Sequence, residues 1–155
     1  MPEWRGANTL NWVLIEGAEE TGVTAHWLTP EFDRGPIVMR RSLRVSDQDT
    51  ALSLSIKLGL VTRDLFLHVL SDIKSGKALP AIPQDEARAR YFRRRLPEDG
   101  RIDWSKSDRE IYNLIRALVN PWPGAFTEFT DGSRLYFAQP VALSEIPRLR
   151  DQYIN

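Results

Sequence analysis

The twenty residues from Thr21 to Arg40 constrain the fold of this chain more than any other stretch. They contain two apolar runs, at 21–29 and 36–39, on either side of a short acidic loop that includes Asp33. In the first run the side chains alternate with a period of two and are rich in strand-forming types, which is typical of a β-strand. The stretch therefore predicts two strands, with Asp33 in the loop at the carboxyl end of the first.

Asp33 has two interpretations in this place. Asp and Gly are the commonest turn residues, so Asp33 followed by Gly35 indicates a structural turn. In an open α/β sheet, however, ligands bind at the carboxyl ends of strands, where a carboxylate can accept a hydrogen bond from a catalytic group. Position alone favours the turn.

Composition removes several classes of protein. The 155 residues suffice for one good core and part of another, and 21 basic side chains balance 21 acidic ones, so no global charge draws the chain to nucleic acid or an anionic membrane. The chain has no cysteine, which excludes a disulfide scaffold and a thiolate metal site and suits a cytoplasmic protein. Its two histidines, His26 and His68, are too few for a histidine-rich metal site, so we expect no metal.

Helical patterns surround the two strands. Apolar spacing predicts a helix over 8–17 and a long helix over 51–74, while 42–45 continues the second strand. Ser107 to Glu110 is a capping box that opens another helix. The runs 125–130 and 133–138, joined at Asp131-Gly132, predict a β-hairpin, and the tail after 140 shows no period.

Residues 77–106 change character, with three prolines and no sustained period, and predict a linker. Within it the run Ala87 to Arg95 places arginines around an aromatic pair. Arginine forks match phosphate oxygens, so Arg93 and Arg94 are candidate substrate contacts; a solvated linker balanced by nearby carboxylates explains the run equally well. Residues 1–6 indicate the end of a loop.

Several segments together resemble the 10-formyltetrahydrofolate-dependent formyltransferases. The likeness extends in consistent order over about residues 1–138, which makes it specific. The matching pieces are Pro2–Gly17, Glu20–Thr24, Phe32–Val38, Arg95–Ser105, Ile111–Ala117 and Asn120–Phe126.

The resemblance implies an α/β fold in three parts. Residues 1–76 would form the C-terminal half of a doubly wound formyltransferase domain, 77–106 an interdomain linker, and 107–155 the start of a small β-rich C-terminal domain. We expect the chain to be a partial formyltransferase, truncated at the first domain and in the last.

The resemblance also implies site residues. Asp33 matches the family's catalytic aspartate, and the loop Thr29, Pro30, Glu31, Phe32 leading into it matches a folate contact. Arg5, Arg93 and Arg94 are the candidate substrate contacts. The family's other two catalytic groups belong to an Asn-X-His sequence, which these 155 residues lack. His26 does not match that histidine. Because the catalytic asparagine and histidine are both missing, we expect the isolated chain to be inactive.

Three functions remain open at this point. The segments 10–17 and 121–126 look closest to the formyltransferases that act on nucleotide-linked amino sugars, and the balanced charge agrees. The arginine run keeps methionyl-tRNA formyltransferase as the alternative. A non-catalytic chain that binds folate or associates with itself through unpaired strand edges is the second alternative.

Overall fold

The computed structural model describes residues 1–154, which divide into two compact units. Unit 1 contains 1–9, 19–46 and 55–94, and unit 2 contains 10–18, 47–54 and 95–155. The predicted linker at 77–106 is therefore divided: its first part, 77–94, packs within unit 1, and the remainder belongs to unit 2.

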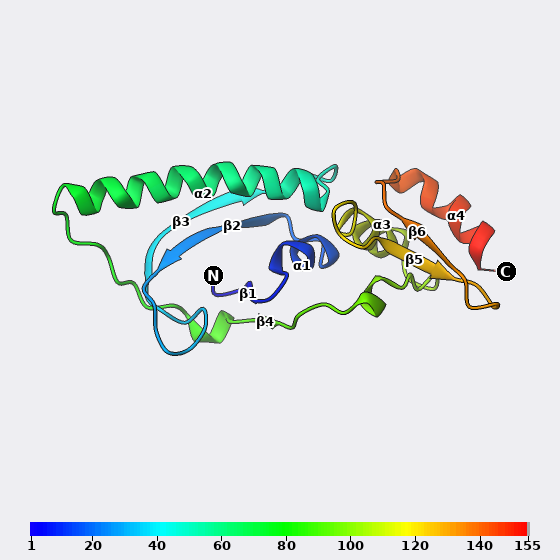
Figure 1. Cartoon of the computed structure of the whole chain (residues 1–155), viewed down its shortest axis with the longest axis horizontal. Helices are drawn as coiled ribbons and strands as arrows, with labels where there is room; N and C mark the ends of the chain where they lie inside the picture. The colour runs from blue at the N-terminus through cyan, green and yellow to red at the C-terminus, as the bar shows by residue number, and fades with distance from the viewer. Residues whose placement is uncertain (155) are drawn as a thin grey trace. The chain divides into compact units, whose positions relative to one another are not determined.

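An antiparallel ribbon forms the centre of unit 1 (Figure 1). Strand β2 (Glu20–His26) pairs with β3 (Ile37–Arg44) from Glu20↔Arg44 onward, and the register shifts once next to His26. The prediction of two strands around an acidic loop is confirmed, with the first strand ending three residues earlier than expected. Val38, Val45 and Leu65 are buried in this unit.

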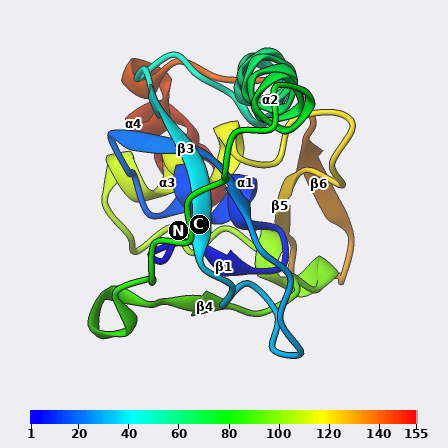
Figure 2. The ribbon, with the colours of Figure 1, turned by 90° about the vertical axis from the view of Figure 1, so that its left-hand side faces the viewer.

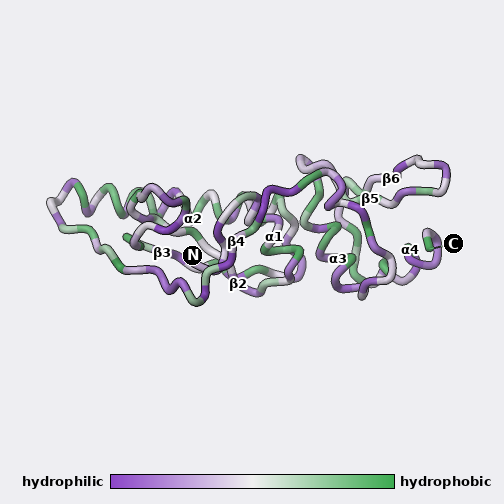
Figure 3. The backbone as a smooth tube through the Cα atoms, turned by 90° about the horizontal axis from the view of Figure 1, so that it is seen from below, coloured by the Kyte–Doolittle hydropathy of each residue, from purple (hydrophilic) through white to green (hydrophobic). Residues whose placement is uncertain are grey.

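Helix α2 (Ala51–Lys74) has the predicted bounds. It runs alongside the β2–β3 ribbon in Figure 1, and apolar segments recur along its whole length in Figure 3. Leu54 and Leu65 are buried, whereas a second set of large apolar side chains on the same helix is exposed. No helix of residues 1–154 is both long and apolar enough to cross a membrane.

A second, smaller sheet in unit 1 joins the start of the chain to the predicted linker. Strand β1 (Arg5–Gly6) pairs in parallel with β4 (Tyr91–Phe92), as Figure 2 shows. A short 3-10 helix, η1 (Glu86–Arg88), precedes β4. The rings of Trp4 and Phe92 stack with centroids 5.1 Å apart. Periodicity could not predict β4, because a two-residue strand has no period.

Unit 2 packs helices α1, α3 and α4 with a hairpin around one core. Helix α1 (Thr9–Ile15) lies within the predicted range 8–17, and its Asn11 donates to the Ala117 carbonyl at 2.7 Å. Helix α3 (Asp108–Arg116) has the predicted capping box at Ser107. The hairpin of β5 (Ala125–Glu128) and β6 (Arg134–Phe137) is also as predicted.

The end of unit 2 differs from the expectation of an irregular tail. The tail forms a short 3-10 helix, η3 (Leu143–Glu145), which helix α4 (Ile146–Tyr153) follows directly. Another short 3-10 helix, η2 (Pro97–Gly100), lies near the start of the 95–155 segment. Trp104 anchors this region, because its indole donates to Thr127 at 3.0 Å and its ring contacts Tyr153.

Candidate active site

The loop between β2 and β3 is held closed at its base. The Trp27 amide donates to the Pro36 carbonyl at 2.9 Å. A Cβ atom at Gly35 would lie 1.6 Å from the Trp27 carbonyl oxygen, so the backbone here approaches more closely than any side chain allows. The two ends of the loop are therefore in direct backbone contact.

Asp33 lies in this loop in an uncommon conformation. Its φ is +62°, in the left-handed region that non-glycine residues seldom occupy. The side chain is half-buried, and its Oδ2 accepts a hydrogen bond from the Gly6 amide at 2.9 Å. The second carboxylate oxygen and its lone pairs are available to orient a further donor.

The residues that lead into Asp33 are the most exposed apolar residues of the loop. Leu28 and Phe32 are each 91% exposed, although both are large and apolar. Thr29 Oγ1 donates to the Glu31 carbonyl at 2.9 Å, which shapes the turn before Asp33. The loop thus places exposed apolar side chains next to a carboxylate, and apolar groups with a few polar ones are what line small-molecule sites.

Arg5 differs from the other candidate substrate residues. Its side chain is 0% exposed, and its guanidinium forms a bidentate ion pair with Glu86 at 2.7 and 2.9 Å. It also donates to Tyr91 and Gln84 at 2.8 Å each. The bond to Glu86 raises the pKa of Arg5 and lowers that of Glu86. Arg5 thus has the surroundings of a structural residue.

Arg93 and Arg94 are exposed, as a substrate contact requires. Arg93 Nη1 donates to the Arg94 carbonyl at 3.1 Å. Elsewhere in the run, the guanidinium of Arg90 lies 4.9 Å from the Phe92 ring. Except for Arg95, which belongs to unit 2, the arginines of this run lie in unit 1 with the Asp33 loop.

Sequence reasoning missed three residues that contact the Asp33 loop or Arg5. Gln84 donates to the carbonyls of Asp33 and Gly35 at 2.9 and 2.7 Å. Tyr91 accepts from Arg34 at 2.8 Å as well as from Arg5, and the bond raises the pKa of Arg34. A glutamine, a glutamate and a tyrosine in a proline-punctuated stretch give no local signal of such contacts.

Two polar side chains of α3 are buried in unit 2. Asn113 and Arg116 are each 4% exposed, and Arg116 Nε donates to Asn113 at 2.9 Å. Burial lowers the pKa of Arg116. Arg116 also donates to the carbonyls of Asp47 and Asp49 at 3.2 and 3.3 Å, which joins α3 to the segment before α2.

The two histidines lie apart from any cluster of metal ligands. The Nδ1 of His26 is 2.9 Å from the Trp27 carbonyl oxygen, and His68 is exposed on α2. Among residues 1–154, no three histidine, cysteine or acidic side chains are grouped so that they could hold a metal ion.

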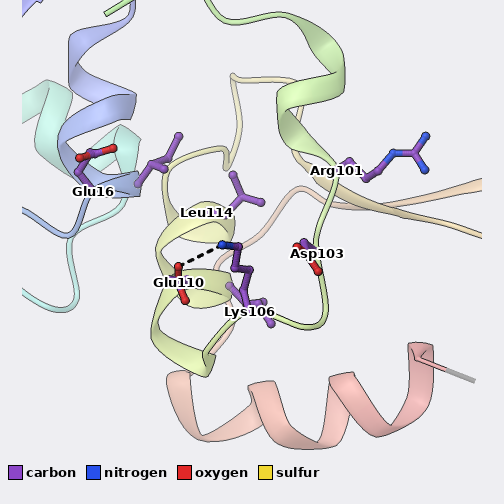
Figure 4. Close-up of a pocket in the computed structure, with 8 residues that line it drawn as sticks. Glu16, Arg101, Asp103, Lys106, Glu110 and Leu114 are labelled. Atoms are coloured by element: carbon purple, nitrogen blue, oxygen red, sulfur yellow. Dashed lines mark ion pairs between the residues drawn. The ribbon is translucent and has the colours of Figure 1, made fainter.

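Unit 2 contains a hollow of about 450 Å³ (Figure 4). Its charged side chains are engaged with neighbours: Lys106 pairs with Glu110 at 3.8 Å, and Asp103 accepts from Ser105 at 2.6 Å. We assign no ligand to it. Its lining residues, none of which was predicted as a site residue, are Ile15, Glu16, Arg101, Asp103, Lys106, Glu110, Ile111 and Leu114.

Two family sequence models match successive parts of the chain. The formyl transferase model matches residues 1–70, and the model of the formyl transferase C-terminal domain matches residues 96–145. Together they cover more than half of the chain. The chain therefore belongs to the formyltransferase family, as its sequence predicted.

Solved structures have the same fold. A 4-N formyltransferase from Francisella tularensis superposes with a TM-score of 0.79 and 21% identity, over 91% of this chain and 59% of that one. The N-formyltransferase of Helicobacter canadensis, in complex with folinic acid and dTDP-3-aminofucose, gives a TM-score of 0.70 and 25% identity over 76% and 44%. HypX from Aquifex aeolicus, in complex with tetrahydrofolic acid, gives 0.69 and 22% over 82% and 22%.

The chain spans less than two thirds of the length of each of these relatives. The predicted fold class, a partial α/β formyltransferase fold with the beginning of a C-terminal domain, is confirmed.

Proposed function

We propose that this chain carries the Asp33 side of a site that transfers a formyl group from 10-formyltetrahydrofolate to the amine of a nucleotide-linked amino sugar. The observation that carries the proposal is the geometry of the β2–β3 loop. It holds Asp33 in a fixed left-handed conformation and exposes Phe32 beside it. Support also comes from the relatives with the same fold, whose ligands include folates and a dTDP-linked amino sugar.

The proposed reaction is an acyl transfer. The acceptor amine attacks the formyl carbon, a new carbon–nitrogen bond forms, and the bond to N10 of the folate breaks as the proton of the amine passes to the leaving nitrogen. An imidazolium and an amide would stabilise the oxyanion that develops on the formyl oxygen. The reaction as proposed uses no metal ion.

Asp33 has a supporting role in this chemistry. A carboxylate beside an imidazole fixes the orientation of the ring and raises its pKa by favouring the cation. Thr29, Pro30, Glu31 and Phe32 would contact the folate, with Phe32 supplying apolar area. Arg93 and Arg94 would attract the phosphates of the acceptor nucleotide.

We expect no formyl transfer from the 155 residues alone, because they contain no Asn-X-His sequence. The test is a formyl-transfer assay with 10-formyltetrahydrofolate and a dTDP-linked amino sugar. Turnover at the rate of a complete sugar N-formyltransferase would contradict the assignment of Asp33 as a group that acts only through a histidine. We further propose a cytoplasmic location, which the absence of cysteine suits.

The acceptor can be tested by binding. An initiator methionyl-tRNA acceptor would make phosphate contacts, and its affinity would fall steeply with added salt. The exposed arginine run is the observation that favours this alternative. We expect a weak and nearly flat salt response for tRNA. A steep response that is abolished by replacing Arg93 and Arg94 with glutamine would favour tRNA over the amino sugar.

Self-association is a second candidate property, and a specific surface favours it. One side of α2 exposes large apolar side chains that are each between 43% and 60% accessible. An apolar patch of this kind marks an interaction surface. Sedimentation at increasing concentration, with Leu60→Lys to disrupt the patch, tests it. The exposed residues are Ile56, Leu60, Phe66, Leu67, Leu70 and Ile73.

A further inference from the structure

A segment predicted as linker makes contacts all along the Asp33 loop. We call residues 80–92 the strap. At its start, the Pro80 carbonyl accepts from the Trp27 indole at 2.9 Å. Two residues later, the amides of Ile82 and Ile37 each donate to the other's carbonyl, at 3.0 and 2.7 Å. The strap thereby reaches the residues at both ends of the loop.

Gln84 of the strap contacts the centre of the loop. Its amide nitrogen donates to the carbonyls of Asp33 and Gly35 at 2.9 and 2.7 Å. The first of these carbonyls belongs to Asp33 itself, which has the left-handed φ, and the second lies two residues further along the loop. One side chain therefore ties the peptide group that follows Asp33 to the one that follows Gly35.

Arg5 determines the orientation of the Gln84 side-chain amide. A guanidinium has donors only, so the atom of Gln84 that lies 2.8 Å from Arg5 Nη2 must be the carbonyl oxygen. The amide nitrogen is then directed to the loop. The Arg5 side chain is itself fully buried, and Glu86 and Tyr91 of the strap hold its guanidinium in place.

Strand β1 contacts both the strap and the loop. The amides of Arg5 and Ala7 donate to the strap carbonyls of Arg90 and Phe92, at 3.0 Å each. Because alternate residues of a strand face opposite ways, the Gly6 amide between them faces the loop and donates to Asp33 Oδ2 at 2.9 Å. The carboxylate of Asp33 is therefore bound to a strand that the strap itself supports.

We propose that Gln84 and Arg5 are positioning residues, which set the Asp33 carboxylate for formyl transfer through the strap. The proposal rests on the proposed function, because it assigns Asp33 a role in the reaction. Groups that act in a transition state must be held within about 0.5 Å of their working geometry, and the surrounding hydrogen bonds provide this precision. The strap is then part of the site.

The test is the variant Gln84→Glu. It keeps the oxygen that accepts from Arg5 and nearly the same shape, but it loses both donors to the loop and brings a carboxylate close to two carbonyls. We expect hydrogen exchange at the Gly6 amide to become at least ~10-fold faster, because the bond to Asp33 opens more often. Exchange at the Ala7 amide, which reports on the β1–β4 pairing, should change less than about threefold.

Two further variants complete the experiment. Gln84→Met lacks the donors without adding charge, and should accelerate exchange at the Gly6 amide in the same way. It replaces Gln84→Glu as the test if the charged variant does not fold. Gln139→Glu introduces the same chemical change in unit 2 and should leave the Gly6 amide as in the wild type. Unchanged exchange at Gly6 in both Gln84 variants overturns the positioning role.

A titration with 5-formyltetrahydrofolate, a stable relative of the proposed donor, separates this inference from the proposed function. If both hold, the wild type binds the folate and Gln84→Glu binds it at least ~10-fold more weakly, since the loop is no longer preorganised. If the wild type shows no binding while Gly6 exchange responds as expected, the folate assignment fails and the positioning of Asp33 by the strap stands. Equal folate affinity in the wild type and the variant, with Gly6 exchange altered, overturns the link between position and function.

Discussion

Replacing Arg5 with methionine removes a buried guanidinium and leaves most of its apolar stem. Two of its hydrogen bonds, to Tyr91 and Gln84 at 2.8 Å, join a charged donor to neutral acceptors in a partly buried setting. Each is worth about 1.5 kcal/mol of stability. The Glu86 carboxylate is 53% exposed and regains water when Arg5 is lost, so we assign no energy to that pair.

An opposing effect reduces the loss. The Arg5 Nε is buried and has no hydrogen-bond partner within residues 1–154, so its removal returns about 1 kcal/mol of desolvation cost. We therefore expect Arg5→Met to lower the free energy of unfolding of unit 1 by about 2 kcal/mol. The measurement is urea unfolding followed through the amide resonances of β2 and β3.

Arg41 supplies the matched control. It is an exposed arginine on β3 in the same unit, so Arg41→Met should change the free energy of unfolding by less than about 0.5 kcal/mol. If Arg5→Met is no more destabilising than Arg41→Met, then the buried network contributes nothing to unit 1, and the reasoning that treats the strap as an integral part of the site is refuted.

Three further predictions concern the loop, the strap and unit 2. Gly35→Ala should lower the free energy of unfolding by at least ~3 kcal/mol in a thermal unfolding experiment, because the new Cβ meets the Trp27 carbonyl. At Gly76 the φ is positive but nothing lies near the new Cβ, so Gly76→Ala should cost about 1 kcal/mol. Equal losses would contradict the close approach at Gly35. Ser107→Ala should cost about 1 kcal/mol by removing the cap of α3, as measured by urea unfolding of unit 2, and no loss would disprove the cap. Arg5 lowers the pKa of Glu86, so the stabilising effect of the ionised carboxylate is complete above the usual pKa of 4.5 and is lost as the pH falls through the lowered pKa of the folded state. Glu86→Gln should therefore have a lower Tm than the wild type at neutral pH and an equal Tm in strong acid. A difference in Tm that persists in acid would contradict the ion pair.

Local patterns predicted the regular elements well. The bounds of α2 follow from apolar spacing that ends at Gly76, and the cap of α3 follows from Ser107 and Glu110. The strands β2 and β3 follow from alternation and from the loop chemistry between them. In each case the residues that decide the element lie within a few positions of it.

The contacts that build the site are not local, and the sequence did not reveal them. Gln84 lies 51 residues from Asp33, and a single polar side chain produces no period that a sequence could show. Arg5 was predicted to contact a substrate because it is charged and lies in a motif, yet the structure buries it against Glu86. Charge alone does not distinguish an exposed arginine from one that is buried against acceptors.

Helix α4 was missed for a different reason. The tail after 140 shows no period, and Pro147 gives no signal against a helix, because proline is well accepted in the first turn, where its missing amide has no partner to lose. Ile146 and Leu149 are both buried at helical spacing. Two apolar residues over one turn are too few to establish a period.

A folate contact at the Asp33 loop is central to the proposed function, and nuclear magnetic resonance tests this contact most directly. The wild-type chain would be titrated with 5-formyltetrahydrofolate while its amide resonances are followed. We predict that the largest shifts fall on the amides of Thr29, Glu31, Phe32 and Asp33 and on Gly6, whose amide binds the Asp33 carboxylate. Shifts that are absent from this loop, or that gather instead around the hollow at Lys106 in unit 2, would contradict the assignment.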